Sequence, residues 1–232
     1  CCIKTQTALL LTLKYHLSEN EELTKQQLLK LFEQSGHKLK TGFVGTPILN
    51  NVLTDNGMND LAYELLLNEE FPGWLYEVKL GATTVWERWN SLLADGTISG
   101  ISMNSMNHYA YGSVQEWMFR HVAGINTMES HPGVKTVQFA PTLNWELRYA
   151  EAGYDSASGM YHIRWELADE EHVVITMDVP FDCTAEVQLP LAAGSEKQAI
   201  AEVLGTEENG RYVLEAGHYE VRYQLSERFG EK

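Results

Sequence analysis

Residues 81–89 read GATTVWERW and set the carboxylate of Glu87 between Trp86 and Trp89, beside the guanidinium of Arg88. An exposed tryptophan and a buried carboxylate each cost free energy, so placing them together calls for a reason. Indole rings beside a carboxylate exclude water, and aromatic faces are surfaces on which sugars stack. A glutamate in this setting suits the general acid or general base of a glycosidase.

The same nine residues also have a purely structural interpretation. In it, Arg88 pairs with another acid, Glu87 caps the start of a helix, and both tryptophans belong to the core. A second candidate is His108, in the segment SMNHYAYG. A histidine between Asn and Tyr can donate a hydrogen bond to a hydroxyl group, but it can equally be a structural residue.

The sequence changes its periodicity near residue 125, which predicts a helical domain over 1–124 and a β-domain over 125–232. Helical signals predict helices over 5–17 and 105–123. They also predict a helix capped by Thr24 and stopped by Gly36, one that starts at Thr46-Pro47 and one that starts at 58 or 59. Alternation with period two predicts strands in 134–141, 144–152, 159–168, 171–180, 183–190 and 218–225. Their short, regular spacing favours a sandwich, while 199–210 fits either a helix or a strand.

The charge balance narrows the choice of partners. The formal net charge is -15 and 44% of the residues are hydrophobic. We expect no nucleic-acid partner, because phosphate binding needs a basic surface, and no binding to an anionic membrane. No apolar run approaches the roughly 20 residues that span a bilayer, and the start of the chain suits an amphipathic helix.

Cysteine and histidine spacing predicts neither a metal nor a cofactor. The cysteines are Cys1, Cys2 and Cys183, without a CxxC pair, and the histidines form no HxH or HxxxH group. Reduced thiols favour a cytoplasmic location. The chain also lacks a GxSxG motif, a P-loop and a GxGxxG motif.

Three segments together resemble the C-terminal part of bacterial α-L-rhamnosidases: 41–92 with TGFVGTP and GATTVWERW, 105–125 with MNHYAYG, and 133–141. That family consists of inverting glycoside hydrolases with an (α/α)6-barrel followed by a small β-sandwich. The resemblance implies an α+β multidomain chain, with the C-terminal part of the barrel in 1–124 and a small antiparallel β-sandwich in 125–232.

The resemblance also implies roles for individual residues. Glu87 looks like the general base that activates water, and His108 looks like a residue that contacts rhamnose. Trp86 and Trp89 would shape the pocket around the base, without a defined ligand contact. The implied substrate is a rhamnose-containing glycoside, and no metal or other cofactor is implied.

One part of the family's pattern is missing. An inverting glycosidase needs a carboxylic acid as well as a base, and nothing in this chain matches the family's acid-bearing segment. About five or six helices are roughly half of a closed ring. We therefore expect a C-terminal fragment that is inactive alone and associates with a second copy or with the missing N-terminal half.

Two further interpretations remain open. The chain is a carbohydrate-binding module if the aromatic residues of the β-domain are exposed, and a structural remnant if nothing binds to it. Those aromatic residues are Trp145, Tyr149, Tyr161 and Trp165. Because aromatic residues on strands usually face the core, burial of these rings would remove the first interpretation.

Overall fold

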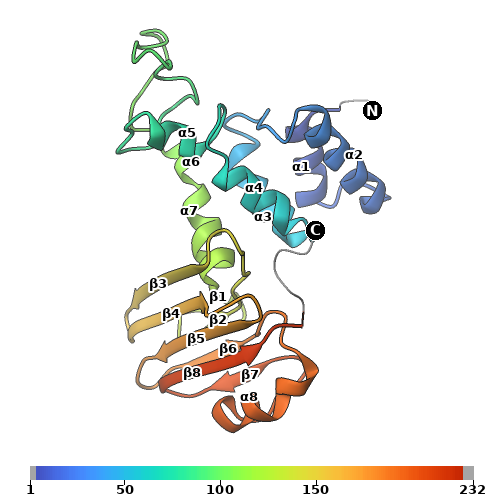
Figure 1. Cartoon of the computed structure of the whole chain (residues 1–232), viewed down its shortest axis with the longest axis vertical. Coiled ribbons are helices and arrows are strands. Elements are labelled where there is room, and N and C mark those ends of the chain that lie inside the picture. Colours follow the sequence, from blue (N-terminus) through green and yellow to red (C-terminus); the bar gives the residue numbers. More distant parts are fainter. Residues whose placement is uncertain (1–3, 227–232) are drawn as a thin grey trace. The chain divides into compact units, whose positions relative to one another are not determined.

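The structure is a computed structural model that describes residues 4–226, so the predictions for Cys1 and Cys2 lie outside the described residues. The chain divides into two compact units, Cys1–Trp117 and Met118–Lys232. The first unit is helical and the second is built from two sheets (Figure 1). Each unit is described by itself.

The first two helices of the helical unit are α1 (Gln6–Lys14) and α2 (Glu21–Gln34). The prediction that Thr24 caps α2 is wrong, because Asn20 is the cap and accepts a hydrogen bond from the Leu23 N–H at 2.9 Å. Two glutamates in the first turn suit the positive end of the helix dipole and let α2 begin one turn earlier. Gly36 follows α2 at φ +65°, as a helix stop requires.

Three further helices lead to the segment that carries Glu87. They are α3 (Thr46–Asp55), α4 (Asn59–Leu67) and α5 (Trp74–Lys79). Pro47 lies in the first turn of α3, as predicted, and Gly57 takes φ +78° between α3 and α4. The Asn50 side chain donates to the Ala62 carbonyl at 3.0 Å and joins these two helices.

The helix predicted over 105–123 is shorter and interrupted. It begins after His108 as α6 (Tyr109–Gly112), continues as α7 (Val114–Trp117) and is followed by the π-helical turn η1 (Met118–Ala123). A Cβ atom added to Gly112 would lie 3.7 Å from Val85 Cγ2. Gly112 therefore marks both a break in the helix and a close approach to the loop that carries Glu87.

The β unit contains two four-stranded sheets. One sheet has the order β1 (Ile125–Thr127), β2 (Thr136–Phe139), β6 (Thr184–Val187) and β7 (Tyr212–Leu214). The other has the order β3 (Tyr149–Ser156), β4 (Gly159–Leu167), β5 (His172–Val179) and β8 (Gly217–Gln224). All pairings are antiparallel except that of β2 with β6.

Two details of the strand prediction change. In 144–152 the first half is a turn, because the Asn144 side chain accepts hydrogen bonds from the backbone N–H groups of Glu146 and Leu147, each at 3.0 Å. The ambiguous segment 199–210 contributes to the helix α8 (Lys197–Leu204). The short strands β1 and β7 have too few residues for a periodic signal.

Alternate residues of the strands form one continuous core in the β unit. Trp165 and Tyr161 are fully buried there. The Trp165 indole donates to the Val122 carbonyl at 2.6 Å and the Tyr161 hydroxyl donates to the Val134 carbonyl at 3.0 Å. Burial rules out a sugar-stacking role for these two rings, whereas Tyr149 is exposed and Trp145 is partly exposed.

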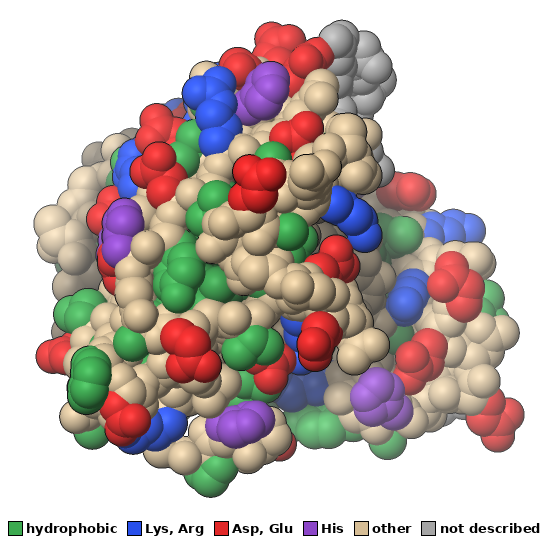
Figure 2. Space-filling view, turned by 90° about the horizontal axis from the view of Figure 1, so that it is seen from below, with side chains coloured by type: hydrophobic (Ala, Val, Ile, Leu, Met, Phe, Trp, Pro, Cys, Tyr) green, Lys and Arg blue, Asp and Glu red, His purple; other side chains and the backbone are tan. Residues whose placement is uncertain are grey.

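Acidic side chains are spread over the face shown in Figure 2, with basic and hydrophobic side chains between them. Acidic side chains of the β unit pair with neighbours, as Glu151 does with His162 and Arg164 at 2.9 Å each. This agrees with an acidic shell in contact with solvent. No helix within residues 4–226 is long and apolar enough to span a membrane.

Candidate active site

The candidate site lies where the irregular segment 82–91, after α5, runs beside residues 105–108. The Glu87 N–H donates to the Ser105 carbonyl at 2.9 Å, and the His108 N–H donates to the Val85 carbonyl at 2.8 Å. The Thr84 hydroxyl donates to the Met106 carbonyl. This backbone pairing brings Glu87 and His108, which lie 21 positions apart in the sequence, to neighbouring places.

Glu87 is 8% exposed, and its Oε2 accepts a hydrogen bond from the Ser105 N–H at 2.7 Å. A hydrogen bond of this length to a carboxylate is charge-assisted and fixes the orientation of the group. The structural interpretation of Glu87 as a helix cap is wrong, because the residue lies between helices and its carboxylate joins two loop segments.

His108 caps α6, and its Nδ1 accepts a hydrogen bond from the Ala110 N–H at 3.2 Å. A ring nitrogen that accepts carries no proton, so the proton of the neutral imidazole lies on Nε2. The ring is stacked against Phe43 at 5.0 Å between centroids and against Tyr109 at 5.3 Å. The cap and the stacking fix the ring with an N–H that is able to donate to a hydroxyl group.

Trp86 and Trp89 are 3% and 8% exposed. The Trp89 ring stacks on Tyr111, with centroids 4.1 Å apart and planes at 6°, and meets the edge of Trp74 at 5.2 Å. The Trp74 indole donates to the Tyr111 carbonyl at 2.9 Å. The rings of Trp74, Trp89 and Tyr111 thus pack on one another and form an apolar wall in the segment that carries Glu87.

The prediction that Arg88 pairs with another acid is also wrong. No carboxylate of residues 4–226 lies within ion-pair distance of the Arg88 guanidinium, and its Nε and Nη2 are buried without a partner. A Cβ atom added to Gly100 would lie 3.7 Å from Nη2, so the guanidinium lies against the loop that follows Glu87. Buried donors of this kind are available to a ligand oxygen.

Glu77 lies at the site, although the sequence did not predict it as a site residue. It is 2% exposed, its Oε2 accepts from the Trp86 N–H at 3.1 Å, and its Oε1 is buried without a partner. Burial raises the pKa of Glu77 from 4.5 to about 7, and the hydrogen bond from Trp86 lowers it by a smaller amount. In the sequence it is an ordinary helix glutamate in WLYEVK, so no pattern marks it.

Tyr111 lies close to the carboxylates of Glu77 and Glu87. Burial raises the pKa of Tyr111, and the negative charges of Glu77 and Glu87 raise it further. The ring that supports Trp89 is therefore held in its neutral form. Within residues 4–226, no group of three or more His, Cys, Asp or Glu side chains has the arrangement of a metal site.

The chain has a helical unit with a nearly buried carboxylate near aromatic rings, followed by a two-sheet unit. This arrangement is that of the helical-hairpin class of glycoside hydrolases. Residues 2–122 match the family model of the bacterial alpha-L-rhamnosidase 6 hairpin glycosidase domain. Residues 124–203 match the bacterial alpha-L-rhamnosidase C-terminal domain. The chain belongs to the bacterial α-L-rhamnosidase family.

Individual relatives agree with this assignment. An alpha-L-rhamnosidase of Formosa agariphila is 41% identical over 188 residues, which cover 80% of this chain and 20% of the relative. An alpha-L-rhamnosidase of Streptomyces avermitilis is 38% identical over 95% of this chain and 21% of its own length. The chain thus spans about a fifth of the length of these two relatives.

Solved structures share the fold. The α-L-rhamnosidase of Streptomyces avermitilis complexed with L-rhamnose gives a TM-score of 0.82 at 37% identity, covering 94% of this chain and 21% of that one. The α-L-rhamnosidase of Aspergillus terreus gives a TM-score of 0.82 at 30% identity, covering 95% of this chain and 24% of that one.

Proposed function

We propose that this chain is the base-bearing C-terminal part of an inverting α-L-rhamnosidase that hydrolyses terminal α-L-rhamnosyl residues. The observation that carries the proposal is the position of Glu87, in an oriented, nearly buried setting next to His108 and an indole wall. The family supplies the substrate class, a rhamnose-containing glycoside.

Each site residue has a role in this proposal. Glu87 takes a proton from the water that attacks the anomeric carbon. His108 donates its Nε2–H to a hydroxyl of the rhamnose ring. Trp86 and Trp89 keep bulk water away from the carboxylate. The Ser105 N–H, 2.7 Å from Glu87 Oε2, fixes the side on which the carboxylate presents its other oxygen.

We infer that the general acid comes from outside this chain. An inverting enzyme places its acid roughly 6.5–9.5 Å from the base, on the other side of the glycosidic bond. Glu77 has an acid's raised pKa, but it is 2% exposed and its Oε2 accepts from the Trp86 N–H, so we do not assign it this role. We therefore propose that the upstream half of the barrel, or a second copy of the chain, completes the site.

Other features remain predictions within this proposal. We infer that no metal or other cofactor takes part, since acid–base chemistry by two carboxyl groups is sufficient for inversion. A cytoplasmic location is inferred only from the cysteine content, and of the three cysteines the structure describes Cys183, a buried free thiol.

The first test is hydrolysis of an aryl α-L-rhamnoside by the purified chain and by Glu87→Gln. We expect no measurable turnover from either protein, because the acid and half of the pocket are missing. Turnover by the chain that is lost in Glu87→Gln would overturn the proposed absence of the acid, while keeping Glu87 as the base.

A second test assigns the base directly. The chain replaces the matching C-terminal part of the Streptomyces avermitilis relative, and Glu87→Gln is compared with Glu33→Gln, an exposed glutamate of α2. In the active chimera, Glu87→Gln is expected to lower kcat on the order of 10²–10⁴-fold, and Glu33→Gln to leave it unchanged. In Glu87→Gly, added azide is expected to restore turnover and give a rhamnosyl azide of inverted configuration. Full activity of Glu87→Gln would exclude Glu87 as the base.

A further inference from the structure

Two loops at one end of the β3–β4–β5–β8 sheet line a cavity of about 520 Å³ that is open to solvent in the β unit. One loop precedes β3 and contributes Trp145 and Arg148. The other joins β4 to β5 and contributes residues 169–172. The two loops meet because β3, β4 and β5 are antiparallel neighbours. None of these residues belongs to the helical unit that carries Glu87.

The first wall of the cavity is rigid. Trp145 packs partly against the core of the β unit, and Asn144 fixes the turn that carries it. Arg148 takes φ +63°, and its backbone carbonyl accepts from the Leu167 N–H at 2.8 Å. Its guanidinium carbon lies 4.7 Å from the Trp145 ring centroid, in cation–π contact. A non-glycine residue at positive φ is unusual and often marks a functional position.

The second wall is equally well fixed. Asp169 Oδ1 accepts from the backbone N–H groups of Glu171 and His172, each at 2.8 Å, and lies 2.9 Å from His172 Nδ1. These hydrogen bonds, the one from Glu171 first, lower the pKa of Asp169. The Glu171 carbonyl accepts from the Leu225 N–H at 2.7 Å. The loop therefore presents Glu170 from a fixed backbone.

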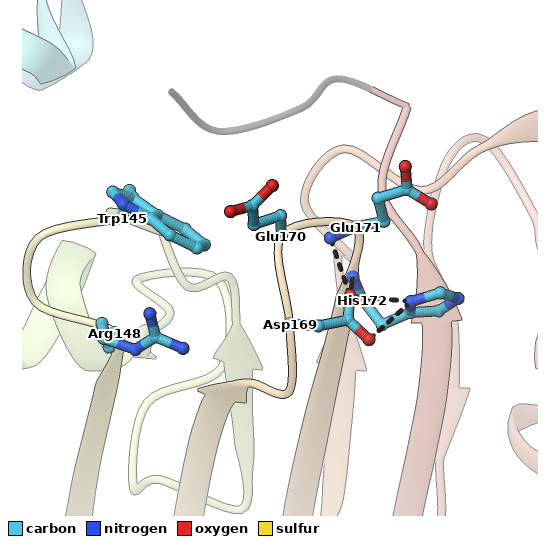
Figure 3. A pocket seen from close by; sticks show the side chains of 6 residues that line it. All are labelled: Trp145, Arg148, Asp169, Glu170, Glu171 and His172. Carbon is cyan, nitrogen blue, oxygen red and sulfur yellow. Dashed lines mark hydrogen bonds and ion pairs between the residues drawn. The ribbon is translucent and has the colours of Figure 1, made fainter. Parts of the chain in front are cut away.

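The side chains of Trp145, Arg148 and Glu170 offer an apolar face, N–H donors and an acceptor to the cavity. In Figure 3, the Glu170 carboxylate points toward Trp145, and the Arg148 guanidinium points into the same space from below the ring. Neither Arg148 nor Glu170 forms an ion pair with a side chain of residues 4–226. An aromatic ring, a free set of N–H donors and a free carboxylate acceptor thus surround one hollow.

We propose that this cavity binds a neutral saccharide unit. The Trp145 ring would contact the apolar face of the sugar, Arg148 would donate to its ring or hydroxyl oxygens, and Glu170 would accept from its hydroxyl groups. The carboxylates of Asp169, Glu170 and Glu171 outnumber the one guanidinium that lines the cavity, which disfavours an anionic sugar. Arg148 already occupies the cation position over the indole, which disfavours an amino sugar.

The binding site is independent of the proposed hydrolysis. It uses none of the residues assigned to the reaction. Of the aromatic residues in the carbohydrate-binding interpretation, burial excludes Tyr161 and Trp165, and the proposed site retains Trp145. Its role would be to hold a neighbouring part of a glycan.

The test is an NMR titration of the ¹⁵N-labelled chain, read at the indole N–H of Trp145 and the Nε–H of Arg148. The probes are methyl α-L-rhamnoside, D-galactose and D-glucose as neutral sugars, D-galacturonate as the anion and D-glucosamine as the cation. We expect saturating shifts of both signals with at least one neutral sugar and a Kd on the order of 1–10 mM. The Trp86 and Trp89 indoles report separately on the candidate active site.

Variants test whether Trp145 and Glu170 bind the saccharide. Trp145→Ala is expected to weaken binding about tenfold or more, and Glu170→Gln, which changes only an exposed carboxylate, about threefold. Phe181→Ala removes an aromatic ring that is 88% exposed elsewhere in the β unit and should leave the titration unchanged. No shift at Trp145 with any neutral sugar up to 50 mM would overturn the proposal. Shifts with only the anionic or only the cationic probe would overturn it as well.

Discussion

The two units of this chain differ in how completely they bury their apolar residues. In the β unit, alternate residues of both sheets form one continuous core. In the helical unit, large apolar side chains stay exposed, with Ile101 101%, Met103 72% and Leu17 71% exposed. Phe181 of the β unit is also 88% exposed, but Ile98, Ile101 and Met103 of the helical unit lie within one loop, and grouped apolar side chains favour an interaction surface. The exposed apolar side chains of the helical unit agree with our proposal that it associates with a second copy or with the rest of the barrel, in a chain that spans about a fifth of its relatives.

The first prediction tests the self-sufficiency of the β unit. Trp165 is fully buried in its core and its indole donates to the Val122 carbonyl at 2.6 Å. Trp165→Ala is expected to lower the free energy of unfolding by about 3–5 kcal/mol, because it leaves a large cavity and an unsatisfied carbonyl. Urea unfolding followed by circular dichroism measures the change, with Tyr149→Ala as the exposed control. A loss below about 1 kcal/mol would contradict a tightly packed core.

The second prediction concerns the free energy that burial of the Glu77 carboxylate costs the helical unit. The pKa of Glu77 is about 7 in the folded state and near 4.5 in the unfolded chain. Between these values the folded state binds more protons, so its stability falls as the pH rises from about 4.5 to 7 and levels off above. The full shift corresponds to about 3.5 kcal/mol, at roughly 1.4 kcal/mol per pKa unit.

Glu77→Gln isolates this effect, because the amide oxygen still accepts from the Trp86 N–H while the charge is gone. Between pH 5 and pH 8, urea unfolding followed by tryptophan fluorescence should show the original chain losing about 2 kcal/mol more stability than the variant. Glu33→Gln, on the exposed side of α2, should keep the original pH profile. Identical profiles for the original chain and Glu77→Gln would show that Glu77 ionises normally.

The third prediction has the smallest effect on stability and bears on association. Ile98, Ile101 and Met103 are exposed in the loop between Glu87 and His108. Replacing all three with serine should shift the chain toward monomer in sedimentation and change the free energy of unfolding by about 0.5 kcal/mol or less. Phe181→Ser with Val213→Ser, at exposed positions of the β unit, is the matched control. A chain that is already monodisperse and monomeric would contradict a self-associating helical unit.

Local signals in the sequence were sufficient where the chemistry is local. Pro47 in the first turn of α3 and the glycine after α2 act through nearby backbone groups, whereas the cap predicted at Thr46 is wrong, because the N-cap is Gly45 and makes no side-chain hydrogen bond. The alternation in β4 and β5 reflects one buried face. Thr24 was misplaced as a cap because two capping residues, Asn20 and Thr24, compete within one turn, and the sequence does not say which side chain reaches a free N–H.

In the candidate site, too, the sequence predicts some features and not others. The composition of GATTVWERW alone marks Glu87, Trp86 and Trp89 as a carboxylate next to indole rings. The sequence did not mark Glu77, whose pKa depends on burial under Trp86, or the unpaired guanidinium of Arg88. Both properties arise from residues that fold over them and leave no trace in spacing.

By itself, the sequence determined the family, the helical and β units, and the identity of the carboxylate and histidine that we assign to the reaction. Tertiary structure alone decided that Glu87 is oriented by Ser105, that His108 Nδ1 accepts from the Ala110 N–H, and that Trp145 lines a cavity while Trp165 is buried. The physical reason is that periodicity and capping act within a few residues along the chain. Burial, hydrogen-bond partners and the direction of a side chain are set by residues that are distant in sequence.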